Sequence, residues 1–141
     1  MRILAVDPGE KRLGVAISDP TGTIATPNTV LQHRSKTADA ERIIALAVEA
    51  CCECIVVGIA LDPDGGETES SRRARNLAAE IRKRSDLEVV LWDEAGSTRA
   101  ARAAAIEIGA PRKKRRGHLD AQAAAVILQS YLDDLKNKLP G

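Results

Sequence analysis

Acidic side chains stand at the ends of two apolar segments, where they could support metal-dependent chemistry. Asp7 ends an apolar run near the amino terminus, and a Pro-Gly turn follows it. Asp93 and Glu94 end a later apolar run that is typical of a buried strand. Because open α/β sheets bind ligands in the crevice beyond the carboxyl ends of their strands, these acids lie where a site is expected.

A further acid, Asp120, opens the last helical pattern of the chain, which we expect from about Leu119 to Lys138. The positions that share a face with it at helical spacing are all apolar, namely Ala123, Ala124, Ile127, Leu128 and Tyr131. This pattern predicts that Asp120 lies on the side of the helix that packs against the sheet. A role as helix N-cap is the alternative for Asp120, and a role in capping the Asp-Pro-Gly turn is the alternative for Asp7.

Three of these acids converge if their strands are neighbours and the last helix starts above the carboxyl ends of those strands. A cluster of carboxylates without His or Cys selects Mg²⁺ or Mn²⁺ rather than zinc. Two such ions about 4 Å apart can activate a water and stabilise the leaving oxygen of a phosphodiester. We therefore expect Asp7, Glu94 and Asp120 to be metal ligands and catalytic residues. Asp93 is the weaker alternative, because strand alternation directs only one of the adjacent acids toward the site.

A run of five basic residues directly precedes the helix that bears Asp120: Arg112, Lys113, Lys114, Arg115 and Arg116. We expect this run to form a mobile loop that contacts the phosphates flanking the scissile bond. Because no aromatic residues are interleaved with it, the run should add affinity without sequence preference. A solvated charge run that binds nothing is the alternative.

The rest of the chain follows the pattern of an α/β domain. A hairpin with an edge strand from Thr23 to Gln32 opens it, and two buried strands then follow crossover helices. The expected helices run from Ser35–Thr37 through Cys52, from Thr68 to about Arg84, and from Ser97 or Thr98 to about Ile108. The expected buried strands are Cys54–Ile59 and Leu87–Trp92.

Composition limits the class of protein. The 141 residues fit one domain, 1–141, with 44% hydrophobic residues but only Trp92 and Tyr131 as large aromatics. This composition argues against a base-stacking platform, which needs several aromatic residues on one surface. The net charge of +1 conceals segregated basic segments, so nucleic acid remains a compatible partner. With neither a signal peptide nor a membrane span expected, the protein should be soluble and cytoplasmic, with no membrane partner.

Three crowded cysteines, Cys51, Cys52 and Cys54, lie where a helix meets a strand. They fit a reducing compartment, and we interpret them as small buried hydrophobes. A metal site would have to recruit His33 or His118 from distant parts of the chain.

Four motifs together resemble those of the YqgF/RuvX family, RNase H-like proteins described as Holliday-junction resolvases and as pre-16S rRNA nucleases. They are D-x-G-x-x-x-x-G from Asp7, V-V-G-x-x-L-x-x-D-G from Val56, W-D-E-x-x-S-T from Trp92, and G-x-x-D-x-x-A-A-x-x-I-L from Gly117. The first motif also occurs in sugar-kinase and actin-like ATPases, which need a second lobe that a chain of this length does not supply. The four motifs in this order cover nearly the whole chain.

The resemblance implies an α/β fold of the RNase H-like, three-layer type, with a five-stranded mixed sheet and helices on both faces. It implies acids at Asp7, Glu94 and Asp120 and a metal-dependent endonuclease that processes the 5′ end of pre-16S rRNA in ribosome biogenesis. Resolution of branched DNA is the alternative, and a non-catalytic nucleic-acid-binding module is a third. The partner is thus structured RNA or branched DNA. A junction resolvase would need two sites facing a symmetric substrate, so the chain is expected to be a monomer or a homodimer.

Two positions depart from the family pattern. Ala95 stands where the family usually has Arg, so a guanidinium that contacts or orients phosphate is missing there. Arg99, one helical turn further along, is a candidate substitute and a candidate nucleic-acid contact. Ala60 stands where the family usually has Pro. Neither departure removes an acid.

Overall fold

The computed structural model describes residues 1–60, 66–93 and 112–138, with 112–120 and 138 described by their backbone alone. The elements of these residues, in chain order, are β1 (Ile3–Pro8), β2 (Arg12–Ser18), β3 (Ala25–Gln32), α1 (Lys36–Glu49), β4 (Cys54–Ile59), α2 (Glu69–Arg84), β5 (Glu88–Asp93) and α4 (Arg112–Lys138). The helix expected from Ser97 to Ile108 lies outside the described residues. No helix in the described part of the chain is long and apolar enough to cross a membrane.

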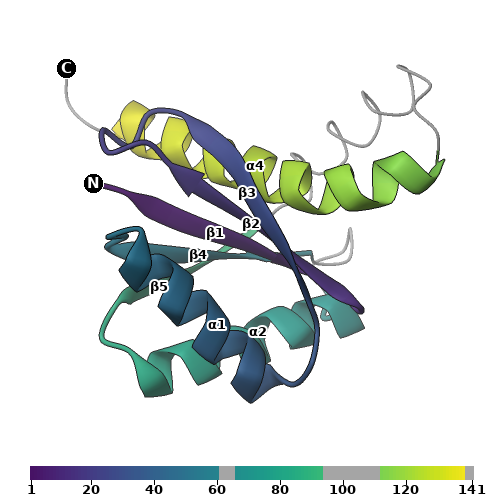
Figure 1. The fold of residues 1–141 in the computed structure, drawn as a ribbon. Coiled ribbons are helices and arrows are strands. Elements are labelled where there is room, and N and C mark those ends of the chain that lie inside the picture. Colours follow the sequence, from purple (N-terminus) through teal and green to yellow (C-terminus); the bar gives the residue numbers. More distant parts are fainter. Residues whose placement is uncertain (61–65, 94–111, 139–141) are drawn as a thin grey trace.

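The strands form one mixed sheet in the order β3-β2-β1-β4-β5. β1 pairs with β2, and β2 with β3, in antiparallel fashion. The pairs β1–β4 and β4–β5 are parallel. Helices α1 and α2 cover one face of the sheet and α4 covers the other (Figure 1). The predicted fold class, an RNase H-like three-layer arrangement around a five-stranded mixed sheet, is confirmed.

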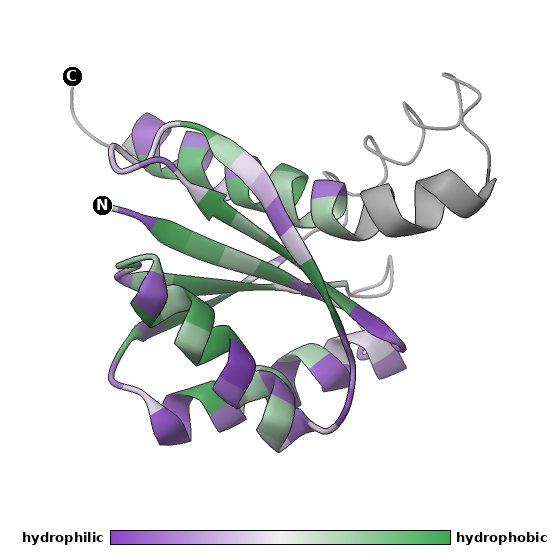
Figure 2. Cartoon of the chain, in the orientation of Figure 1, coloured by the Kyte–Doolittle hydropathy of each residue, from purple (hydrophilic) through white to green (hydrophobic). Residues whose placement is uncertain are grey.

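Alternation along β1 divides the core into two halves. Leu4 and Val6 are fully buried against α1 and α2, whereas Ile3 and Ala5 are fully buried against α4. Both faces of this strand are covered, so its sequence is a continuous apolar run rather than an alternating one. Figure 2 shows the apolar colouring along the central strands and the polar colouring on the outer surfaces of the helices.

Helix α4 packs on the sheet through the stripe that the sequence indicates. Ala124, Ile127 and Leu128 are fully buried there. A hydrogen bond also joins this helix to the sheet: the Trp92 indole of β5 donates to Ser130 Oγ at 3.2 Å. The Trp92 ring also meets the Tyr131 ring edge-on, with centroids 5.2 Å apart.

The starts of α1 and α2 agree with the predicted caps. The Ser35 hydroxyl accepts the Ala38 N–H at 3.1 Å. Thr68 and Ser71 form a reciprocal capping box, in which each side chain accepts the other residue's N–H.

The end of α1 differs from the prediction, because the helix stops at Glu49 rather than continuing through Cys52. Cys51 adopts a left-handed backbone with φ 59°. The Cys52 N–H then bonds Ala47 O at 2.8 Å and the Cys51 N–H bonds Val48 O at 3.1 Å, the two bonds of a Schellman motif. A non-glycine residue at this position hid the helix end, because glycine is the usual sequence signal for it. Cys52 and Cys54 are buried among apolar residues and Cys51 is exposed.

Candidate functional site

Asp7 lies at the carboxyl end of the central strand of the sheet. It continues the series Ile3 and Ala5, so strand alternation places it on the face that α4 covers. Its cross-strand partner is Gly14, which has no side chain to occupy the space beside the carboxylate. The side chain of Asp7 is half-buried.

The turn after Asp7 is held by its backbone. The Gly9 N–H donates to Arg12 O at 2.9 Å. A Cβ at Gly9 would stand 2.5 Å from that same oxygen, so only glycine fits this turn. The hairpin therefore fixes where β1 ends and, with it, where Asp7 is presented.

The register of β5 determines the face of the sheet on which Asp93 lies. Asp93 pairs with Ile59 and follows Trp92, which packs on the α4 side. Strand alternation therefore places Asp93 on the opposite face, with Ile59 and the α1–α2 half of the core. Glu94 lies outside the described residues. This placement favours Glu94 over Asp93 as the ligand, which stays a prediction.

Asp120 belongs to α4, one helical turn before Ala123 and Ala124. Those two alanines are buried against the sheet, so the sequence prediction for this stripe of the helix is confirmed from Ala123 onward. Asp7 and Asp120 thus belong to the two elements that face each other across this side of the sheet, since α4 contacts β1 as well as β2 and β3.

The basic run does not have the predicted backbone. Residues 112–116 are helical and form the start of α4, so the prediction of a loop, and of a helix beginning near Leu119, is wrong. Lys and Arg are good helix formers, so a run of these residues is compatible with a helical backbone. Arg99 lies outside the described residues.

The expected acid cluster includes two side chains, those of Glu94 and Asp120, that lie outside the described part of the structure. Within the described residues, no three or more His, Cys, Asp or Glu side chains gather closely enough to hold a metal ion. Glu94 and the Asp120 side chain are not among them. The ligand set Asp7, Glu94 and Asp120 therefore stays a prediction.

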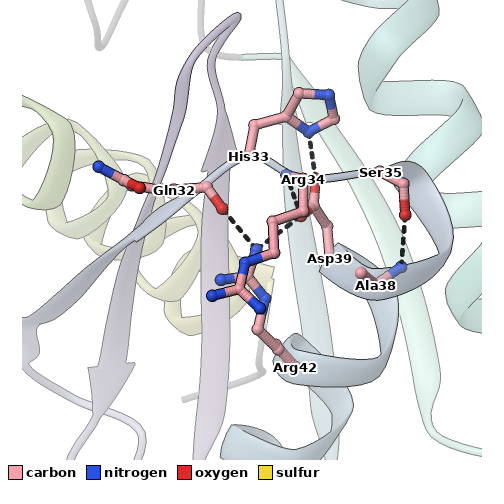
Figure 3. Close-up of polar contacts among 7 residues, drawn as sticks. All are labelled: Gln32, His33, Arg34, Ser35, Ala38, Asp39 and Arg42. Atoms are coloured by element: carbon pink, nitrogen blue, oxygen red, sulfur yellow. Dashed lines mark hydrogen bonds and ion pairs between the residues drawn. The ribbon is translucent and has the colours of Figure 1, made fainter.

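Sequence reasoning missed a polar junction between β3 and α1, drawn in Figure 3. Asp39 is buried there and accepts hydrogen bonds from Arg42 Nη2 at 2.7 Å and from the Arg34 N–H at 3.1 Å. The Nδ1 of His33 contacts the second oxygen of the same carboxylate. The spacing of Asp39 and Arg42, three residues apart on a helix, was the available signal.

Burial raises the pKa of Asp39, but the hydrogen bonds from His33, the Arg34 N–H and Arg42 outweigh burial and hold this pKa below its ordinary value. The carboxylate is therefore charged at neutral pH and joins the end of β3 to the first turn of α1. On the other face of the sheet, burial raises the pKa of Cys54 to about 12, with the nearby Glu88 adding to the effect. Cys54 is thus a neutral core thiol, in agreement with the structural interpretation of the cysteines.

The strand order, with an acid at the end of the central strand and a second acid on the helix that covers it, defines an α/β domain of the RNase H-like class. A family model described as "RuvX: Holliday junction resolvase" matches residues 1–134, and the chain belongs to this family.

Curated relatives agree with this assignment. A protein named "Putative pre-16S rRNA nuclease" from Anaeromyxobacter sp. (strain Fw109-5) is 41% identical over 133 residues, covering 94% of this chain and 97% of the relative. The protein of that name from Halothermothrix orenii is 38% identical over 141 residues, and the alignment spans the full length of both chains.

Solved structures show the same fold at low sequence identity. RuvC from Thermus thermophilus in complex with a Holliday junction substrate aligns with a TM-score of 0.61 at 15% identity, covering 98% of this chain and 97% of that one. The fowlpox virus resolvase in complex with Holliday junction DNA gives a TM-score of 0.54 at 15% identity, covering 96% and 99%.

Proposed function

We propose that this protein is a divalent-metal-dependent endonuclease that hydrolyses phosphodiester bonds at the 5′ end of pre-16S rRNA during ribosome biogenesis in the cytoplasm. Its membership of a nuclease family supports hydrolysis of nucleic acid. The names of relatives 35–41% identical to it support the ribosomal RNA precursor as substrate.

One observation carries the proposal: alternation along β1 turns Asp7 toward α4, the helix on which Asp120 lies. This arrangement supports the proposal that Asp7 and Asp120 act together on this side of the sheet. The register of β5 excludes Asp93 from that side and favours its neighbour, Glu94.

The donor set fits Mg²⁺ or Mn²⁺, because it consists of carboxylates alone, while Cys52 and Cys54 are buried in the core and His33 contacts Asp39. Asp7, Glu94 and Asp120 would hold the ions, which when bound supply Lewis-acid stabilisation of charge on the reacting phosphate. Asp7 is presented near the end of the central strand, at a turn that the Gly9–Arg12 backbone bond closes. The basic residues 112–116 lie on the same helix as Asp120 and can attract the flanking backbone.

Cleavage of branched DNA is the competing function, favoured by the description of the family model. Both reactions use the same carboxylates and differ in how the backbone is presented. A junction has two-fold symmetry, so its resolution would require a homodimer with two sites facing one substrate, whereas precursor processing can be carried out by a monomer.

The test is parallel incubation of the purified protein with Mn²⁺ and either a pre-16S rRNA fragment or a synthetic four-way DNA junction. The Asp7→Asn variant serves as the control for contaminating nucleases. We expect cleavage of the rRNA fragment by the unsubstituted protein only. Cleavage of the junction alone would establish the competing function, and no cleavage of either substrate would reject the endonuclease.

A further inference from the structure

A small cavity opens beside the turn that follows Asp7, on the face of the sheet away from α4. Its volume is about 100 Å³, and its walls include Pro8 and Gly9 of the turn, Lys36 at the start of α1, and Arg73 and Asn76 of α2. Ligand pockets for drug-sized molecules are usually about 300–1,000 Å³. This cavity can therefore hold one small group but not a whole nucleoside.

The charges around the cavity favour an anion. Lys36 and Arg73 contribute two cationic side chains, and Asn76 adds an amide donor. Asp39 is a carboxylate in the same wall, but Arg42, the Arg34 N–H and His33 already satisfy it. The cationic groups therefore keep an excess of positive charge and of hydrogen-bond donors.

Arg73 provides the second, independent observation. Its Nε–H is buried and has no acceptor among the residues that the structure describes. A buried donor without a partner is unfavourable, and Arg73 lines the cavity, so an anion there lies beside a guanidinium whose hydrogen-bonding capacity is not satisfied. The guanidinium fork matches two oxygens of a phosphate, which makes phosphate the anion that this wall would hold best.

We propose that this cavity binds a single phosphate group, held by Arg73 and Lys36 with Asn76 as an additional donor. The phosphate comes either from a nucleic-acid strand or from a free phosphate ion. The assignment of this phosphate to a nucleic-acid strand rests on the proposed function. Asp7 and Pro8 are consecutive on β1 and face opposite sides of the sheet. A nucleic-acid strand that crosses this edge of the sheet would therefore place one phosphate near Asp7 and another in the cavity.

The first arm of the test uses inorganic phosphate and no metal ion, with the side-chain Nε–H resonance of Arg73 followed by NMR. Phosphate should shift this resonance in a saturable manner. The Lys36→Gln variant, at an exposed position that should not disturb folding, should weaken binding by about tenfold. The matched control is Arg72→Gln, an exposed residue of α2 outside the cavity, which should bind phosphate as the unsubstituted protein does.

The second arm measures binding of a single-stranded RNA to the metal-free protein at several salt concentrations. If a phosphate of the RNA strand fills the cavity, Arg73→Gln makes the negative slope of log K against log salt shallower by about 0.7. Arg72→Gln leaves this slope unchanged. A circular dichroism spectrum and a thermal melt show whether Arg73→Gln is folded, and Lys36→Gln repeats the measurement at an exposed position.

A response in both arms supports the strand as the source, and a response to inorganic phosphate alone supports a free-ion site. The absence of a saturable shift with phosphate, or equal effects of Arg72→Gln and Lys36→Gln, would overturn the proposal. Neither arm measures cleavage. A protein that binds phosphate here but cuts no nucleic acid would therefore refute the proposed function and leave this site standing.

Discussion

Replacement of Asp39 by Asn tests whether the carboxylate at the β3–α1 junction stabilises the fold through its charge. Asp39 is 2% exposed and accepts from Arg42 Nη2 at 2.7 Å and from the Arg34 N–H at 3.1 Å, besides its contact with His33. Asn keeps the size of the side chain and one acceptor oxygen. It loses the negative charge that strengthens the bonds to Arg42 and His33.

The expected cost follows from these contacts. Hydrogen bonds to a charged group contribute about 1.5–3 kcal/mol and neutral ones about 0.5–1.5 kcal/mol, and the contacts with His33, the Arg34 N–H and Arg42 all lose this charge assistance. The Arg42 side chain is 28% exposed, so water offsets part of the loss. We expect Asp39→Asn to lower the free energy of unfolding by about 2 kcal/mol at pH 7, which corresponds to a fall in Tm of about 6 °C for a chain of this size.

The pH dependence gives a sharper test than the magnitude. Because the native pKa of Asp39 lies below its ordinary value of 3.8, its contribution is complete above about pH 5 and is lost as the pH falls through the native pKa. The difference in unfolding free energy between the unsubstituted protein and Asp39→Asn should therefore shrink between pH 7 and pH 3.

Urea unfolding of both proteins at pH 7, 5 and 3 measures this difference. The matched control is Glu41→Gln, an exposed carboxylate two residues further along α1, which should change stability by no more than about 0.5 kcal/mol. The reasoning is refuted if Asp39→Asn and the unsubstituted protein unfold at the same urea concentration at pH 7, or if their difference is unchanged in acid.

Three further predictions concern the junction after α1 and the basic start of α4. Cys51→Gly should raise the free energy of unfolding by about 0.5 kcal/mol, because relief of the left-handed backbone outweighs the added freedom of the unfolded chain; a less stable variant would contradict the helix end described here. In the folded protein Cys51 should react quickly with a thiol reagent and Cys54, with its pKa of about 12, only on unfolding; equal rates would place Cys54 at the surface. Replacing Lys113, Lys114 and Arg115 together by Gln should weaken RNA binding most at low salt and reduce the salt slope, each lost contact accounting for about 0.7; an unaltered slope would assign the run to solvent.

The sequence was sufficient to predict the sheet and its two covered faces. Continuous apolar runs such as Cys54–Ile59 indicate strands buried on both sides, and the spacing of Ala124, Ile127 and Leu128 indicates one apolar stripe on the last helix. These signals are local and periodic. They therefore survive in a single sequence, as does the position of Asp7 at the carboxyl end of a strand.

Other features could not be predicted, for two physical reasons. α1 ends in a left-handed residue at Cys51, which lacks the glycine that usually signals a helix end, and residues 112–116 are helical because Lys and Arg are good helix formers, although their like charges predicted a loop. The cavity beside the turn is built from residues distant in sequence, such as Pro8 with Arg73. No pattern within one segment reveals such a contact.

The most direct test of the central claim is the rate of Mn²⁺-dependent cleavage in four single variants whose folding has been verified by circular dichroism. Asp7→Asn, Glu94→Gln and Asp120→Asn should each reduce the rate by about a hundredfold or more, because each removes a carboxylate that holds the stabilising cation. Asp93→Asn, on the opposite face of the sheet, should cleave at nearly the unsubstituted rate. Near-normal cleavage by any two of the first three variants, or a loss with Asp93→Asn as large as with Glu94→Gln, would contradict the account.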